Sequence, residues 1–409
     1  MFIAKSWKFL FVISLLFFIL WGCDDSSNKS KSDDTDSVVN TDSDSDTDSD
    51  SDTYSDNTSV PTKDICKDVG SVFGMGAAIY GDAGTNWYLN GADSSYNIDW
   101  LSGYMYTSGD PQDDLDGTDW IINYRLDTAE EGGATLPVVT FYRMLNVGED
   151  YGYKGTEAQI VQQMLLNGDA VKDYLDDFIE VLKIINGRST PTLMHVEPDS
   201  FGFMMWAFDG FDTASGNGDA KSVPVALSDA NHPALAGQSF SDDAGGLGKA
   251  MLFLRDTYAP AARMGWHASN FRVGTKPEIV TSFYSSMGAW DVIVTEPPHM
   301  INNSSEPWDM DDSDNENNAE WLKTVSSTTG LPIVIWQTFA YDSEAYIGGW
   351  PDNQSNINLL AQNGVVAVFW DPNSESCGYT CKEADNLLDY LNKYSAAPLT
   401  LPAGTICNP

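Results

Sequence analysis

The chain has 409 residues, of which 60 are Asp or Glu and only 21 are Lys or Arg, so its formal net charge is −39 at pH 7. This excess of negative charge argues against nucleic acid and against an anionic lipid surface as partners of the folded part, because phosphate groups are bound mainly by Lys and Arg. A neutral or cationic partner is expected.

The amino terminus has the pattern of an export signal. Lys5 and Lys8 precede an apolar run that ends in LWGC at positions 20–23. This ending resembles the bacterial lipobox, which implies that residues 1–22 are a signal peptide and that Cys23 carries a lipid. The alternative interpretation is an uncleaved anchor helix.

Residues 23–65 form a second compositional unit, dominated by the sequence TDSDSDTDSDSDTYSD. The unit contains almost no apolar residues, so it cannot bury enough surface to offset the loss of chain entropy and is expected to be disordered. Repulsion between its Asp side chains extends it further. We interpret it as a lipidated stalk that holds a domain away from a membrane.

Residues 66–409 alternate between short apolar runs and segments with helical periodicity. Runs of this kind, separated by helices, predict a parallel sheet covered on both faces. The runs are 71–79, 97–105, 135–144, 192–199, 263–269, 291–298, 331–339 and 365–372. Helices are predicted at 170–187, 245–258, 277–287, 318–330, 355–364 and 382–394.

Eight strand–helix units in one domain favour an α/β fold of the (β/α)8 TIM-barrel type, with residues 66–409 as the catalytic domain. A doubly wound open sheet is the alternative. No glycine-rich phosphate loop follows the first predicted strand to support that alternative.

The four cysteines of this domain suggest two disulfides, since an exported domain is oxidised. Cys66 and Cys407 bracket the domain and would join its ends. Cys377 and Cys381 lie together in SCGYTC and would close a loop. Their spacing matches no standard zinc knuckle, so no metal is expected at these cysteines.

The sequence TLMHVEPDSFG at positions 192–202 places three ionisable residues at the end of the fourth predicted strand. In (β/α)8 barrels the active site is built at this carboxyl-terminal face. Side chains alternate along a strand, so Leu193, His195 and Glu197 share one face, and His195 and Glu197 are expected to point into the barrel.

Other predicted strands also end in residues suited to chemistry or to binding. Only four histidines occur in the chain, and three of them fall at the ends of the fourth, fifth and sixth strands. The substrate-binding candidates at these strand ends are Tyr142, Arg143, Trp266, His267, His299, Trp336, Gln337, Trp370 and Asp371.

Two carboxyl groups facing each other across a barrel mouth suit glycoside hydrolysis, in which one is protonated and the other ionised. Glu197 is the predicted general acid and Glu296 its nucleophile or base partner. Asp199 and Asp371 are substitutes if that geometry fails, and His195 is expected to hold Glu197 or tune its pKa. The expected substrate is a polysaccharide or oligosaccharide stacked on Trp side chains, and no cofactor is expected.

The motifs together resemble a group of exported bacterial barrel proteins. The similarity rests on HVEPD at 195–199, YAP at 258–260, GWH at 265–267 and WQ at 336–337. The resemblance implies a (β/α)8 barrel of glycoside-hydrolase type in an exported protein. Together with the lipobox-like sequence, this predicts a protein that is lipid-anchored to a bacterial membrane, at the cell surface or in the periplasm. The sequence EPDS is also similar to family 6 cellulases, but their other motifs are missing.

Two other functions stay open. The first is a metal-dependent hydrolase that uses His195, Glu197, His267, Glu296 and His299, although the first predicted strand lacks the HxH pair that such barrels usually carry. The second is a non-catalytic carbohydrate-binding lipoprotein, since aromatic side chains serve binding as well as catalysis.

Overall fold

The computed structural model describes most of the predicted barrel domain. All described residues belong to one compact unit, Asn57–Pro409. They are 65–79, 100–105, 122–123, 126–132, 136–208, 219–269, 276–296, 313–339, 342–371 and 382–408. The predicted signal peptide, the predicted stalk as far as residue 64, and the pair Cys377 and Cys381 lie outside them. Ile65, the last residue of the predicted stalk, belongs instead to the folded domain, where it begins a helix and is buried. No helix in these ranges is long and apolar enough to cross a membrane.

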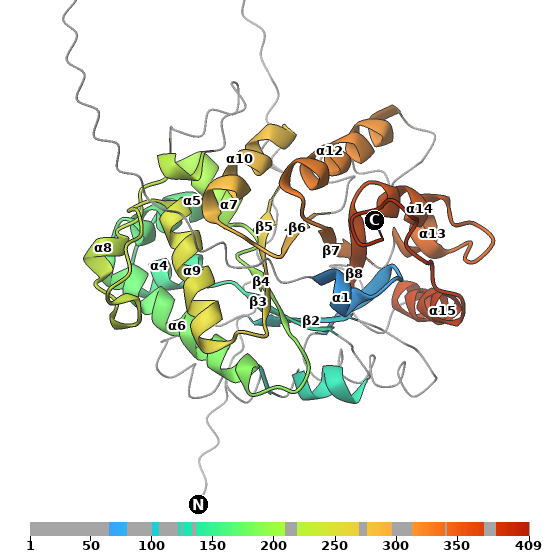
Figure 1. Ribbon diagram of the computed structural model, residues 1–409, viewed down its shortest axis with the longest axis horizontal. Helices are drawn as coiled ribbons and strands as arrows, with labels where there is room; N and C mark the ends of the chain where they lie inside the picture. The colour runs from blue at the N-terminus through green and yellow to red at the C-terminus, as the bar shows by residue number, and fades with distance from the viewer. Residues whose placement is uncertain are drawn as a thin grey trace, which may run out of the picture. The chain divides into compact units, whose positions relative to one another are not determined.

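Eight parallel strands close into a barrel in chain order, with β1 paired to both β2 and β8 (Figure 1). The (β/α)8 prediction is therefore confirmed, and the alternative of an open sheet is wrong. The strands are β1 (Gly74–Ile79), β2 (Trp100–Met105), β3 (Leu136–Phe141), β4 (Leu193–Val196), β5 (Arg263–Ala268), β6 (Val292–Thr295), β7 (Ile333–Phe339) and β8 (Val365–Asp371).

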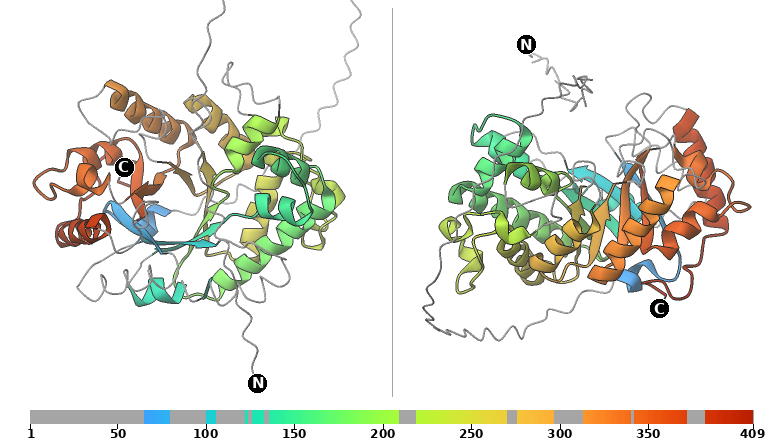
Figure 2. Two further views of the ribbon diagram at one scale, coloured as in Figure 1. Left: turned by 180° about the vertical axis from the view of Figure 1, so that it is seen from behind. Right: turned by 90° about the horizontal axis from the view of Figure 1, so that it is seen from above.

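Helices surround the strands, as the two views of Figure 2 show. The helices are α1 (Ile65–Val69), α4 (Met144–Asp150), α5 (Glu157–Leu165), α6 (Gly168–Asn186), α7 (Ser200–Ala207), α8 (Leu227–Ala230), α9 (Ala244–Tyr258), α10 (Pro277–Met287), α12 (Ser313–Thr329), α13 (Ser343–Ile347), α14 (Ser355–Gln362) and α15 (Lys382–Ala396). Two short 3-10 helices, η1 (Ala220–Ser222) and η2 (Pro233–Leu235), join α7 to α9.

The long helix α6 illustrates how the sequence sets these elements. It begins after Asn167, whose side chain accepts a hydrogen bond from the amide of Ala170 at 3.1 Å, and it ends at Gly187. Apolar positions at helical spacing bury Tyr174 and Phe178, both of which pack on Phe141 of β3. Burial of each such side chain stabilises the fold by roughly 1.5–3 kcal/mol.

Two hydrophobic cores result from the alternation of side chains along the strands. The inner core fills the barrel and includes Val138, Leu193 and Val294. The outer core lies between the barrel and the helices and includes Met194, Val196 and Trp266. A strand-end residue therefore belongs either to the barrel interior or to the outer core, according to its position in the alternation.

A disulfide between Cys66 and Cys407 joins the two ends of the domain, with a Cα–Cα distance of 5.0 Å, and this prediction is confirmed. Backbone hydrogen bonds reinforce the closure, since the amide of Phe73 donates to Leu399 O at 2.8 Å and the amide of Leu401 donates to Ser71 O at 2.8 Å. The bond holds the segment before β1 against the segment after α15.

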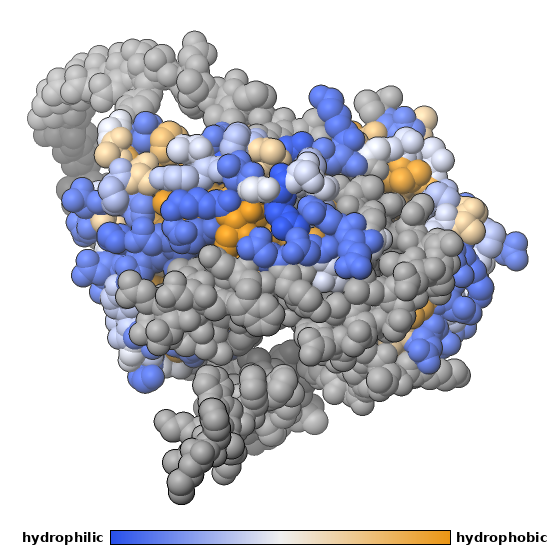
Figure 3. Space-filling view, turned by 90° about the horizontal axis from the view of Figure 1, so that it is seen from below, coloured by the Kyte–Doolittle hydropathy of each residue, from blue (hydrophilic) through white to orange (hydrophobic). Residues whose placement is uncertain are grey.

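Where described residues are coloured, the face drawn in Figure 3 is largely hydrophilic, with small separate hydrophobic areas. Among the described residues, the exposed large hydrophobic side chains are Tyr151, Leu166 and Trp206. This surface agrees with the acidic composition of the chain.

Candidate active site

Strands β3 to β7 bring a set of polar side chains together at their carboxyl ends, inside the barrel. Parallel strands all end at the same face, so residues on the inward side of successive strand ends become neighbours. The inward residues that meet here are Thr140, His195, His267, Glu296 and Trp336.

Four of these residues form a chain of close polar contacts across β3, β4, β5 and the end of β6. Thr140 Oγ1 lies 3.2 Å from His195 Nδ1, and His195 Nε2 lies 2.8 Å from His267 Nδ1. His267 Nε2 in turn lies 3.1 Å from Glu296 Oε1, although the ring N–H does not point along the line that joins these two atoms. All four side chains are buried. We name this set the Thr–His–His–Glu chain.

Trp336 covers the two imidazole rings. Its ring centroid lies 4.8 Å from that of His195 and 5.5 Å from that of His267. Burial lowers the pKa of His195 well below its usual value, and the neighbouring His267 lowers it further. His195 is therefore neutral at physiological pH and carries a single ring N–H.

Asp199 is the second carboxyl group of this site. It directly precedes α7, is partly exposed, and hydrogen-bonds with the hydroxyl of Tyr142. Burial raises the pKa of Asp199, His267 opposes this rise, and the nearby carboxyl of Glu296 adds to it. Asp199 and Glu296 thus lie close enough to influence each other electrostatically, and His267, which contacts Glu296, lies within the same range of Asp199.

Glu197 does not point into the barrel as the alternation predicted. Its backbone has φ of +53°, which turns the side chain away, and Oε1 accepts hydrogen bonds from the amides of Arg143 at 2.9 Å and Met144 at 3.1 Å. The hydroxyl of Tyr174 on α6 faces the same carboxyl group. Burial raises the pKa of Glu197 to about 8, opposed mainly by the amides of Arg143 and Met144.

The predicted contact between His195 and Glu197 is replaced by other bonds, because the ring nitrogens of His195 face Thr140 and His267. A positive φ is uncommon for a residue other than glycine and is often found at functional sites. Here it lets Glu197 join the end of β4 to the start of α4.

Two predicted substrate-binding tryptophans lie in the outer core and not at the barrel mouth. Trp266 is fully buried and packs edge-on against Phe283 and Trp290. Trp370 is likewise fully buried, against Tyr346. The physical reason is the alternation itself, since an inward His267 forces its neighbour Trp266 outward.

The side chain of Arg143 also forms its ion pairs away from the mouth of the barrel. Its guanidinium pairs with Asp177 of α6 at 2.7 Å and with Asp150 at 3.5 Å, and its side chain is almost fully buried. A buried pair of this kind holds α4 against α6. The structure therefore assigns Arg143 a packing role in place of the predicted role in substrate binding.

Two predicted residues remain at the carboxyl ends of β7 and β8. Gln337 is partly exposed and has φ of +60°, at a register shift between Ile335 and Thr338 that marks a bulge in β7. Asp371 is the last residue of β8 and is 6% exposed. His299, the remaining predicted residue, lies outside the described ranges.

Sequence reasoning missed Thr140 and Tyr174. Thr140 could have been predicted from the sequence, because Leu136, Val138 and Thr140 share one face of β3. The prediction instead chose Tyr142 and Arg143, which follow the end of that strand. No comparable signal marks Tyr174, which reaches Glu197 from the middle of α6.

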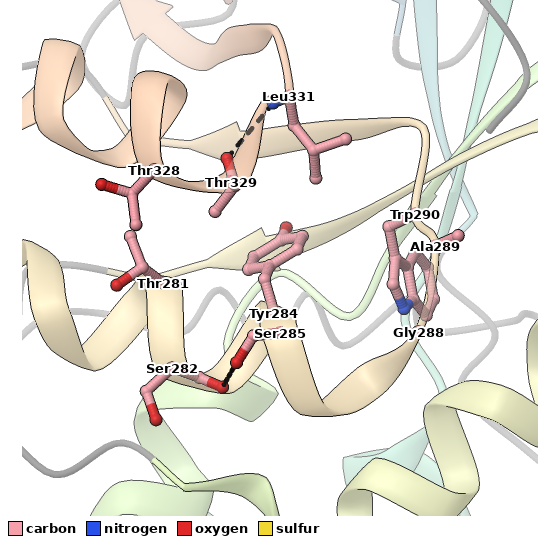
Figure 4. Close-up of a pocket in the computed structure, with 10 residues that line it drawn as sticks. All are labelled: Thr281, Ser282, Tyr284, Ser285, Gly288, Ala289, Trp290, Thr328, Thr329 and Leu331. Atoms are coloured by element: carbon pink, nitrogen blue, oxygen red, sulfur yellow. Dashed lines mark hydrogen bonds between the residues drawn. The ribbon is translucent and has the colours of Figure 1, made fainter. Parts of the chain in front are cut away.

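A cavity of about 470 Å³ opens elsewhere, between α10 and α12 (Figure 4). Its lining includes Gly288, Trp290 and Leu331, which precede β6 and β7, so it lies at the amino-terminal end of the barrel. The hydroxyls of Tyr284 and Thr329 that line it donate to backbone carbonyls of the protein. The catalytic face of a barrel is the opposite end, so this cavity is not the candidate site.

The described residues contain no group of three or more His, Cys, Asp and Glu side chains arranged to hold a metal ion. In the Thr–His–His–Glu chain, the facing nitrogens of His195 and His267 bond to each other and do not converge on a common point.

Comparison with known proteins identifies the fold. No family model matches the chain, and no curated protein sequence is similar to it. GH26C from Muricauda sp. MAR_2010_75 has a similar structure at 12% identity and a TM-score of 0.51, over 83% of this chain and 92% of that chain. The exo-beta-1,4-mannosidase Op5Man5 from Opitutaceae bacterium strain TAV5 is similar at 11% identity and a TM-score of 0.50, over 81% of this chain and 61% of that chain. At these identities the likeness shows the fold alone, a barrel of the kind that glycoside hydrolases use.

Proposed function

We propose that this protein hydrolyses glycosidic bonds of a polysaccharide or oligosaccharide, with Asp199 as the general acid and Glu296 as the nucleophile or base. The observation that carries the proposal is that Asp199 and Glu296 lie within electrostatic range of each other, with His267 in contact with Glu296. A glycosidase requires one protonated and one ionised carboxyl group near the scissile bond.

The surroundings of Asp199 favour the role of acid. Burial and the charge of Glu296 both raise the pKa of Asp199, which favours the protonated form that an acid must supply to the leaving oxygen. Asp199 is also partly exposed, so a substrate can reach it. Glu197 is 1% exposed and its Oε1 is held by two backbone amides, so it is less suited to that transfer.

The test uses the full chain and a panel of plant and microbial polysaccharides, β-1,4-mannans among them, with released reducing sugar as the readout. Asp199→Asn and Glu296→Gln are each expected to lower the rate by about 10²–10⁴-fold. Glu197→Gln is expected to stay within about tenfold of the wild type, because a neutral amide can accept the same two hydrogen bonds.

Glu320→Gln, on the exposed side of α12, is the matched control for loss of one carboxylate. Full activity in Asp199→Asn, or a larger loss in Glu197→Gln than in Asp199→Asn, would contradict the assignment of the acid. The absence of released sugar from every polysaccharide, together with retained binding, would show a carbohydrate-binding protein instead. The configuration of the product reports on Glu296, since retention requires a nucleophile and inversion a base.

We also propose that a lipid on Cys23 anchors the protein to a bacterial membrane, with residues 24–64 as a spacer. Support comes from the lipobox-like sequence and from the acidic composition of the spacer. Cys23→Ser is expected to release the protein into the soluble fraction or to block its processing. Normal cleavage with unchanged membrane association would refute the lipid.

A further inference from the structure

The Thr–His–His–Glu chain raises the question of which atoms in it carry protons. The carboxylate form of Glu296, which its proposed role requires, can only accept hydrogen bonds, and it lies 3.1 Å from His267 Nε2 without a hydrogen bond between them in this geometry. A proton on Nε2 is the arrangement that this contact favours, and a His267 ring with that single N–H has an unprotonated Nδ1, which accepts. The atom that faces this Nδ1 is His195 Nε2, at 2.8 Å.

The same reasoning continues to the start of the chain. His195 Nε2 must carry the ring proton, and since His195 is neutral its Nδ1 can only accept. Thr140 Oγ1 lies 3.2 Å from that Nδ1 and is able to donate its hydroxyl proton. Every donor in the chain then points from Thr140 towards Glu296. This direction is set at the Glu296 end, because a carboxylate can only accept, and the hydroxyl of Thr140 can supply the matching donor at the other end.

We propose that Thr140 is a positioning residue whose hydroxyl donates to His195 Nδ1 and so stabilises the arrangement in which the protonated Nε2 atoms of His195 and His267 face His267 Nδ1 and Glu296. The expected effect of Thr140 on catalysis rests on the proposed function of Glu296. The expected hydrogen-bond pattern of the two histidines does not depend on that function. Thr140 touches no reacting atom and acts through His195 and His267.

The barrel holds this arrangement rigidly. Thr140 and His195 are direct partners in the register of β3 and β4, so their separation follows from the backbone ladder. Gly265 is the partner of His195 on β5, and His267 lies two residues further along the same face. Thr140, His195 and His267 are buried, and Trp336 lies against both imidazole rings, so a lost hydrogen bond here is not replaced by bulk water.

A serine hydroxyl can replace the donor, whereas valine keeps the shape of threonine and removes the donor. Thr140→Val therefore leaves His195 Nδ1 as a buried acceptor without a donor, and the directed chain is lost. Thr140→Ser preserves the chain. This pair of variants separates the hydrogen bond from the packing of the side chain.

The primary experiment is nitrogen-15 NMR of the full chain with labelled histidine, because protonated and unprotonated ring nitrogens resonate at well-separated frequencies. The four histidine signals are assigned by replacing each histidine in turn. The wild type and Thr140→Ser are expected to show His195 and His267 each with a protonated Nε2 and an unprotonated Nδ1. Thr140→Val is expected to lose the single tautomer at His195.

The second readout is hydrolysis of whichever polysaccharide in the panel releases most sugar. Thr140→Val is expected to lower kcat by about tenfold to a hundredfold with little change in KM, and Thr140→Ser to restore most of it. A wild-type His195 protonated on Nδ1, unchanged tautomers in Thr140→Val, or changed tautomers with an unchanged kcat would each overturn the inference. A protein that hydrolyses nothing but shows the expected tautomers would refute only the proposed function.

Discussion

Glu197 offers a direct test of how burial acts on a carboxyl group. The perturbation is Glu197→Gln, which keeps the shape of the side chain and an oxygen that accepts from the amides of Arg143 and Met144. The variant cannot ionise. Its stability is therefore expected to depend on pH differently from that of the wild type.

The magnitude follows from the two pKa values. The pKa of Glu197 is 4.5 in the absence of structure and about 8 in the fold, because burial disfavours the charged form. A group whose pKa is raised on folding contributes stability that is fully present below the unfolded value and is lost as the pH rises through the folded value. At about 1.36 kcal/mol per pH unit, the cost to the wild type is roughly 1 kcal/mol at pH 5, about 3 at pH 7 and about 5 at pH 9.

The assay is urea unfolding of the full chain and the variant at these pH values, with Glu320→Gln as the control for loss of an exposed carboxylate. The comparison uses only the change with pH in the difference between the two free energies of unfolding. A difference in stability between the Glu and Gln side chains that does not depend on pH therefore cancels. The free energy of unfolding of Glu197→Gln, relative to the wild type, is expected to increase steadily from pH 5 to pH 8. A difference that stays constant within about 0.5 kcal/mol, or that decreases, would refute the reasoning.

Two further predictions concern the stability of the barrel. A Cβ at Gly265 would lie 2.6 Å from Val292 Cγ1 and 2.9 Å from Val294 Cγ2, so Gly265→Ala is expected to lower the free energy of unfolding in urea by about 1–3 kcal/mol. Gly187→Ala at the end of α6 is the control, because a Cβ there would meet only one atom, at 3.4 Å. Equal effects of the two substitutions would contradict the packing argument. Replacement of both Cys66 and Cys407 by Ala is expected to cost about 2–5 kcal/mol, because the disulfide restricts the unfolded chain across 341 residues. An unchanged urea midpoint would count against this role of the disulfide.

The local patterns of the chain were sufficient for the architecture. Apolar runs such as 331–339 and amphipathic segments such as 277–287 predict strands and helices wherever the period is clear, and the structure has a strand at Ile333–Phe339 and a helix at Pro277–Met287. The start of α12 was placed too late, since the helix begins at Ser313, because its first residues are acidic and polar and resemble a loop. The carboxyl-terminal face could likewise be assigned from the barrel prediction, since every parallel strand ends there.

The roles of individual residues at the strand ends were harder to predict from the sequence. His195 and His267 lie on the same side of neighbouring strands, and the sequence indicated that both belong to the site. Trp266 and Trp370 were predicted to bind substrate, because an indole ring can stack on a sugar as readily as it packs in a hydrophobic core. Their positions in the alternation, once the strand register is known, place them in the outer core.

The periodicity of the predicted strands and helices determined the fold class and the face of the barrel that carries the candidate site. The two cysteines that bracket the domain determined the disulfide between its ends. The tertiary structure alone decided where the side chain of Glu197 points. Alternation along β4 predicts that it faces the barrel interior, but a positive φ at that one residue turns it towards α4, and Asp199 is the carboxyl group whose pKa is influenced by His267 and Glu296. The reason is physical: period-two patterns report where a regular strand places its side chains, whereas the dihedral angles at the end of a strand are set by contacts with distant segments such as α4 and α6.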